Sequence, residues 1–332
     1  MSFEIGDIHP NTPHLFADLA ELLLISGYIG RKNIHKNDLE SLIVNGTVSS
    51  DEIDEEEEAS AEELRLHKSS AEKCNRPEIQ LEDVLSQLEY RSKALKDYYP
   101  FQYDREQIIL KEDVTDKHRV YKMLLACSRL RSFGTGGVPQ RWAKHFALLS
   151  KEALMGILPS HAITKIFDAN SDDRKNYYST NLPQALRVLG KDLGVLAINE
   201  VECDKASTSG DAGFDLIATV AFNDGAATNY AILGQCGAQE TGWPDKSLEA
   251  HSINCRNYFQ IQFDYPSVMF TPVCYREVTG EWVSNANGNG ILLVDRMRML
   301  SLIESRNSWT EIVNTSWFSS FEHEFVKVTT SP

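Results

Sequence analysis

Residues 210–246 decide the fold of this chain, because two apolar runs of strand type here each carry a polar residue. The first run is Gly210-Asp-Ala-Gly-Phe-Asp215-Leu-Ile-Ala-Thr-Val-Ala-Phe222 and the second is Tyr230-Ala-Ile-Leu-Gly-Gln235-Cys236-Gly237, followed by Trp243-Pro-Asp-Lys246. A buried strand has no need of Asp215 or Gln235. A carboxylate, an amide oxygen and an ammonium converging at a sheet edge indicate a divalent-cation site that activates water against a phosphodiester.

The segment resembles the core of the PD-(D/E)XK nuclease superfamily over residues 139–305. Gly213-Phe-Asp215-Leu-Ile-Ala is similar to the Gly-x-Asp-apolar-apolar-Ala run of restriction-like enzymes, and Gln235-Cys-Gly237 is similar to their Gln-Cys-Lys, with Gly in place of the lysine. The resemblance implies an α/β fold in which helices flank a restriction-endonuclease-like mixed sheet.

The resemblance also implies a ligand set for Mg²⁺ or Mn²⁺. Asp215 and the side-chain carbonyl of Gln235 are the expected ligands, and the backbone carbonyl of Cys236 is a further one. Residues 235 and 237 share a face of a strand, so Gly237 is expected to leave open the space of the usual lysine. Lys246, in the first turn of the next helix, is expected to reach over Gly237. Alternatively, Lys246 is a solvated surface residue of an inactive nuclease fold.

Residues 193–203 read as the strand before the one that carries Asp215. Glu200 and Glu202 would share a face of that strand, and Glu200 is a candidate third metal ligand. A strand edge that turns polar explains both residues equally simply. Asp211 is another candidate ligand, but it lies in Ser-Gly-Asp-Ala-Gly, where turn chemistry is the preferred interpretation.

The chain divides into a mainly helical region, 1–137, and a nuclease-like domain, 138–332. Apolar spacing predicts helices over 13–25, 36–44, 81–95, 116–131, 140–155, 182–193 and 246–259. Strands are expected over 215–222, 230–237, 267–274 and 288–294, and Pro272 favours an edge position for the third of these. A helix should follow the last strand, and Arg296 and Arg298 near the junction are candidates for contacting phosphate. Alternatively, Arg296 forms a salt bridge with Asp295 or a neighbour.

Composition sets limits on the function. The net charge is −15, and nine acidic residues between 51 and 63 belong to an acidic linker over 46–76. Such a block is typically solvated, although it can also occupy a basic groove. Six scattered cysteines indicate reduced thiols in the cytoplasm, and Cys236 is expected to pack rather than to act as a nucleophile. No 18-residue apolar run exists, so we expect neither a signal peptide nor a membrane span.

Together these features predict a metal-dependent nuclease, a Mg²⁺-dependent endonuclease that hydrolyses DNA. The resemblance implies a bacterial restriction or anti-phage system, with an ATPase or helicase subunit as partner or a homo-oligomer. The competing hypothesis is a catalytically inactive interaction subunit that keeps the fold. Gly237 and the acidic balance of the chain favour that alternative.

Overall fold

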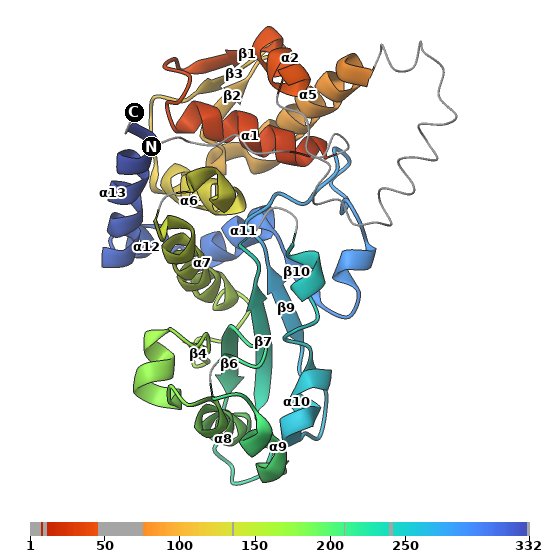
Figure 1. Cartoon of the computed structure of the whole chain (residues 1–332), viewed down its shortest axis with the longest axis vertical. Coiled ribbons are helices and arrows are strands. Elements are labelled where there is room, and N and C mark those ends of the chain that lie inside the picture. Colours follow the sequence, from red (N-terminus) through yellow and green to blue (C-terminus); the bar gives the residue numbers. More distant parts are fainter. Residues whose placement is uncertain are drawn as a thin grey trace.

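The computed structural model describes residues 8, 12–45, 76–134, 136–208, 210–238 and 242–330 (Figure 1). The predicted acidic linker lies outside these residues except for its last position, 76. The described chain is a mixed α/β structure built around a five-stranded sheet.

The central sheet has the strand order β10-β9-β7-β6-β4. Strands β4 (Ile163–Ile166), β6 (Leu216–Val220) and β7 (Tyr230–Cys236) form an antiparallel meander. Strands β9 (Ser267–Phe270) and β10 (Leu292–Val294) continue the sheet parallel to β7. The sheet is therefore mixed, as the sequence predicts.

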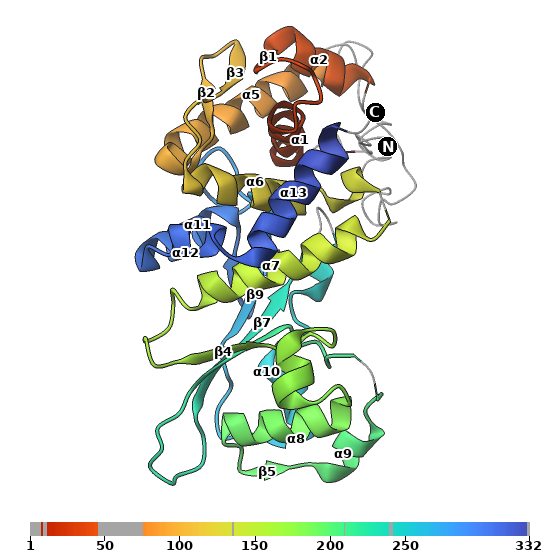
Figure 2. The ribbon, with the colours of Figure 1, turned by 90° about the vertical axis from the view of Figure 1, so that its left-hand side faces the viewer.

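Helices cover both faces of this sheet, which Figure 2 shows edge-on. Side chains alternate along β6, so Leu216 and Ala218 pack in one core cluster with α7 (Val138–Leu154), whereas Ile217 packs in a second with α8 (Leu182–Leu193). Helix α10 (Ser252–Tyr258) contributes to the second cluster through Cys255. This helix–sheet–helix layering confirms the expected sheet flanked by helices.

The N-terminal region contains the predicted helices and also an unpredicted sheet. The helices are α1 (Pro13–Ile25), α2 (Lys36–Asn45), α5 (Arg76–Leu95) and α6 (Asp116–Ser128). The strands β1 (Asn33–His35), β2 (Phe101–Tyr103) and β3 (Gln107–Leu110) form an antiparallel sheet in the order β1-β3-β2. Strands this short give almost no period-two signal, so the sequence does not reveal them.

The C-terminal helices return to the N-terminal region. They are α11 (Arg296–Arg306), α12 (Trp309–Val313) and α13 (Ser316–Thr330). Trp142 of α7 packs against Phe321 and Phe325 of α13, with ring centroids 5.0 and 5.9 Å apart. One hydrophobic core therefore runs from α1 through the sheet to α13.

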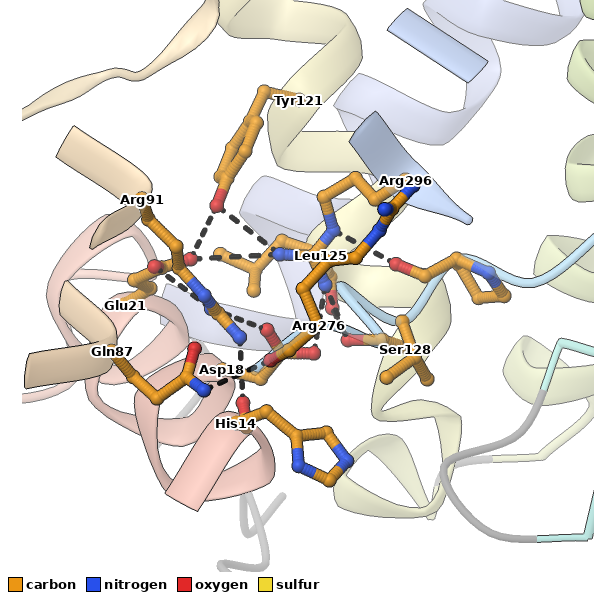
Figure 3. A network of polar contacts seen from close by, with 12 residues as sticks. His14, Asp18, Glu21, Gln87, Arg91, Tyr121, Leu125, Ser128, Arg276 and Arg296 are labelled. Atoms are coloured by element: carbon orange, nitrogen blue, oxygen red, sulfur yellow. Dashed lines mark hydrogen bonds and ion pairs between the residues drawn. The ribbon is translucent and has the colours of Figure 1, made fainter. Parts of the chain in front are cut away.

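A buried network of charges ties α1, α5 and α11 together (Figure 3). The Arg296 guanidinium lies 2.7 Å from the Asp18 carboxylate, and Arg91 bridges Asp18 and Glu21 at 2.7 and 2.9 Å; all four side chains have no exposed surface. Arg296 is thus enclosed in ion pairs and is not available to a phosphate. Arg296 therefore forms salt bridges, but with residues of α1 and not with Asp295, which pairs with Arg276 at 2.9 Å.

Two strand predictions are wrong. Residues 193–203 are not one strand, because Gly194, with φ +63°, ends α8 and Asn199 caps a new helix, α9 (Glu200–Lys205). Between them β5 (Ala197–Ile198) pairs with β8 (Phe259–Gln260) in a separate two-stranded sheet. Gly194 and Asn199 are the local sequence signals for the end of one helix and the start of the next.

The predicted edge position of the third strand is also wrong. Strand β9 lies between β7 and β10, and it ends at Phe270 before Pro272 can interrupt its ladder. The predicted helix over 246–259 is shorter than expected. A 3₁₀ turn, η4 (Pro244–Lys246), precedes a separate α10.

The cysteines and the apolar helices can be described directly. The five described cysteines are free thiols, and four of them are buried. In the described part of the chain, no helix combines the length and the apolar character needed to cross a membrane.

Candidate metal centre

Asp215 and Gln235 lie at adjacent ends of two paired strands. The β6–β7 register ends where Leu216 pairs with Gly234, so Asp215 immediately precedes the last paired residue of β6 and Gln235 immediately follows that of β7. The backbone N–H of Asp215 donates to the Gly234 carbonyl at 3.0 Å. The sheet brings these two predicted ligands together at the start of β6 and the end of β7.

Two further carboxylates meet Asp215 at this point. Oxygens of Asp168, Asp211 and Asp215 all lie within 4.8 Å of one another, close enough to share one cation. Asp168 follows β4, where the Phe167 N–H donates to the Asp215 carbonyl at 2.6 Å. Asp211 lies in the turn before β6. It forms the expected turn, because its carboxylate accepts from the Gly213 N–H at 2.9 Å, and it is also part of the cluster.

The amide of Gln235 is held by a fourth acidic residue. Its Nε2 donates to a carboxylate oxygen of Glu249 at 3.0 Å. The side-chain oxygen Oε1 of Gln235 is buried and has no hydrogen-bond partner among the described residues. A buried carbonyl oxygen without a donor is costly, and a cation beside Asp215 would satisfy it.

The turn that carries Glu249 packs directly on the Asp211 turn. Gly213 adopts φ +82°, and a Cβ at this position would lie 2.8 Å from the Glu249 carbonyl oxygen. Only glycine permits both this conformation and this approach. The glycine of the Gly-x-Asp motif therefore has a structural reason here.

The surroundings of Asp215 raise its proton affinity. Burial, together with the charges of Asp211, Asp168 and Glu249, raises the pKa of Asp215 to about 7, although the Cys236 N–H donates to its carboxylate at 2.8 Å. A cation is the natural compensation for such a group of like charges.

Cys236 contributes its backbone to this site. Burial and the Asp215 charge raise the pKa of its thiol well above the ordinary value, so the thiolate is disfavoured. The side chain packs against the main core cluster. These features agree with the expectation that Cys236 packs and is not a nucleophile.

The expected open space over Gly237 does not exist. A Cβ at 237 would lie 2.5 Å from both the Met269 Cε and the Trp243 Cβ. Trp243 and Met269 therefore fill the place where the usual lysine would begin, and the prediction of a vacancy there is wrong. Lys246 is exposed in η4, and its carbonyl accepts from the Glu249 N–H at 3.0 Å.

Glu200 lies away from these carboxylates. It is on α9, where its carboxylate forms an ion pair with Arg187 at 2.6 Å. Glu202 of the same helix pairs with Lys205 at 2.7 Å. The structure thus gives both glutamates surface partners and does not bring Glu200 into the Asp168–Asp211–Asp215 cluster.

Sequence reasoning missed Asp168 and Glu249 and set Asp211 aside. Asp168 lies in a loop 47 positions before Asp215, and no periodic pattern marks it. Glu249 follows Lys246 by three positions, in the turn after β7. Its short sequence distance from this predicted site residue was a signal that Glu249 lies near the site. The sequence around Asp211 favours a turn, so its role as a ligand was the less preferred of two interpretations.

The site as a whole offers oxygen ligands typical of Mg²⁺, Mn²⁺ or Ca²⁺. Its members come from the ends of β4 and β7, the turn before β6 and the turn after β7. Comparison of the chain with protein-family models, with curated proteins and with solved structures gives no match.

Proposed function

We propose that this chain is a divalent-cation-dependent nuclease that hydrolyses phosphodiester bonds of DNA. The observation that carries the proposal is the group of Asp168, Asp211 and Asp215, whose carboxylate oxygens lie within 4.8 Å of one another beside the end of β7 that carries Gln235. The Oε1 atom of Gln235 is buried and has no hydrogen-bond partner among the described residues. The meander of β4, β6 and β7, followed by α10 and a β9 parallel to β7, also supports the resemblance to the PD-(D/E)XK superfamily.

The donor set fits Mg²⁺ or Mn²⁺. Asp215, Asp168, Asp211 and the Gln235 carbonyl would hold the cation, with the Cys236 backbone carbonyl as a possible further oxygen ligand from the resemblance. When bound, the cation supplies a Lewis acid that makes a coordinated water more acidic and neutralises charge on the phosphate.

The chain's own residues have distinct roles in this proposal. The Cys236 N–H holds one oxygen of Asp215 in place, and Glu249 fixes the amide of Gln235 so that Oε1 is the free atom. Lys246 provides an exposed ammonium on the same turn as Glu249, which can contact the substrate phosphate or the attacking oxygen. The resemblance places such a nuclease in an anti-phage or restriction system with an ATPase or helicase subunit, or in a homo-oligomer.

A second candidate is the inactive interaction subunit. The filled space at Gly237 favours it, because no lysine can begin beside Gln235. The two functions make different predictions for the acidic residues. An interaction subunit does not require a cluster of three carboxylates, nor a buried Gln235 Oε1 that has no hydrogen-bond partner among the described residues. A cation-dependent enzyme does.

The test is cleavage of linear and supercoiled DNA by the purified chain with Mg²⁺ or Mn²⁺, alone and with candidate partner subunits, and with RNA as the alternative substrate. Asp215→Asn is expected to abolish cleavage. Asp224→Asn is the matched control, because Asp224 is exposed and its carboxylate accepts only from the Ala226 N–H in its own loop. Cleavage retained by Asp215→Asn would refute the proposed site.

A further inference from the structure

The loops that carry Asp168 and Asp211 meet at one buried arginine. Arg174 begins a short π-helix, η3 (Arg174–Tyr178), and its side chain is fully buried. Its Nη1 donates to the Phe167 carbonyl at 2.9 Å and to the Gly210 carbonyl at 3.1 Å. Each of these carbonyls belongs to the residue immediately before a clustered aspartate. One guanidinium nitrogen thus links both loops.

The rest of the guanidinium is fixed as well. Its Nε donates to the Ser179 carbonyl at 2.9 Å, and the group lies 4.6 Å from the centre of the Phe167 ring. The Arg174 backbone N–H donates to the Ser171 hydroxyl, which itself donates to the Ile166 carbonyl. The arginine is therefore held at both its backbone and its head group, which makes it a rigid connection.

Arg174 also brings positive charge to the cluster. Burial lowers its pKa, and the Asp211 and Asp168 carboxylates oppose that shift, which places their charges near the guanidinium. Nη2 is buried and has no hydrogen-bond partner among the described residues. A guanidinium stays protonated in proteins, so this charge is permanent.

We propose that Arg174 is a positioning residue that joins the Asp168 and Asp211 loops and thereby sets the affinity of the carboxylate cluster for a divalent cation. The inference rests on the proposed function for its cation site, but not on catalysis. Arg174 is enclosed and touches neither substrate nor reacting atoms. Residues that orient metal ligands commonly change metal affinity about 10- to 100-fold when they are replaced.

The test is Mn²⁺ titration by calorimetry on Arg174→Lys and Arg174→Gln, with the folded state of each variant verified by circular dichroism. Neither side chain reproduces the guanidinium fork, so each should bind Mn²⁺ about tenfold or more weakly. Arg187→Lys is the matched control, because Arg187 pairs with Glu200 and Asp204 at the surface and should leave the affinity unchanged.

Two additional measurements separate positioning from general stability. Amide exchange should accelerate in both segments 166–171 and 210–214 of Arg174→Lys. The Mn²⁺ concentration for half-maximal cleavage should rise, whereas the rate at saturating Mn²⁺ should stay unchanged. Wild-type Mn²⁺ affinity in either folded variant overturns the inference. Normal Mn²⁺ binding by a wild-type chain that cleaves no nucleic acid would instead contradict the proposed function alone.

Discussion

The Asp215 carboxylate accepts a hydrogen bond of 2.8 Å from the backbone N–H of Cys236, the residue that follows Gln235. This contact connects the two strands at the point where both predicted ligands lie. It favours the ionised form of Asp215, yet burial and three nearby carboxylates outweigh it and raise the pKa to about 7. The ionised form of Asp215 is therefore unfavourable in the cation-free site, and a bound cation would offset this unfavourable free energy.

Asp215→Asn should consequently stabilise the cation-free protein at alkaline pH. The folded pKa lies above the unfolded value of 3.8, so the contribution of Asp215 is fully favourable below pH 4 and is lost as the pH rises through 7. The shift sets an upper limit of about 4 kcal/mol at pH 8. Urea unfolding with EDTA between pH 5 and 8 should show a flatter profile for Asp215→Asn than for the wild type. An identical profile for the two proteins would contradict the raised pKa, and Asp224→Asn serves as the control.

Gln235→Glu should have opposite effects on stability and on cation affinity. A carboxylate at 235 would lose the hydrogen bond from Nε2 and would face Glu249 as a like charge. We expect the cation-free protein to lose about 1–3 kcal/mol, whereas Mn²⁺ should bind about tenfold more tightly because the site gains a charged ligand. Thermal unfolding with and without Mn²⁺ measures both. Gln260→Glu, at an exposed position on β8, should change neither quantity, and weaker Mn²⁺ binding by Gln235→Glu would argue against Gln235 as a ligand.

Lys246→Ala should reduce cleavage about 100-fold and leave Mn²⁺ affinity unchanged, because the ammonium is assigned to the reacting phosphate and not to the cation. Lys205→Ala is the control, since Lys205 is an exposed lysine paired with Glu202 on α9. Gly237→Lys would not place an amine beside Gln235, because Trp243 and Met269 fill the space at position 237. Full activity of Lys246→Ala would mean that this lysine is surface charge only.

Arg296→Met should destabilise the fold by about 3–5 kcal/mol, because it removes one of the two guanidinium groups that neutralise the buried carboxylates of Asp18 and Glu21. Burial alone would raise the pKa of Asp18, but Arg296 and Arg91 lower it, so Asp18 is charged in the folded state. The exposed pair of Arg306 with Glu152 provides the comparison, and Arg306→Met should cost less than about 1 kcal/mol. Equal effects of the two substitutions in urea unfolding would show that the buried network contributes little.

The sequence predicts those parts of the fold that depend on local patterns. Strand β7 and helix α8 were expected at their observed positions, because both have clear apolar periodicity. The two strand-like runs also predict that Asp215 and Gln235 lie near the same edge of the sheet, and the pairing of β6 with β7 places them at adjacent strand ends. By contrast, the apolar pattern does not predict the short strand β5 and the helix α9 within residues 195–205, whose local signals are the caps at Gly194 and Asn199.

The rest of the site depends on tertiary structure. Asp168 reaches the cluster only because β4 pairs with β6, and Arg174 reaches it only through the backbone carbonyls of two loops. The space at Gly237 could not be assessed without the positions of Trp243 and Met269. The sequence therefore predicts which polar side chains lie on each strand of the site, but it does not predict which residues of other segments lie beside them.

The most direct test of the cation site is a crystal structure of the chain soaked in Mn²⁺, with anomalous data collected for manganese. The account predicts one strong anomalous peak between the carboxylates of Asp168, Asp211 and Asp215, at about 2.2 Å from the Gln235 Oε1. Asp215→Asn crystals should lack this peak. A wild-type site without manganese at saturating Mn²⁺, or a peak bound elsewhere and unaffected by Asp215→Asn, would contradict the central claim.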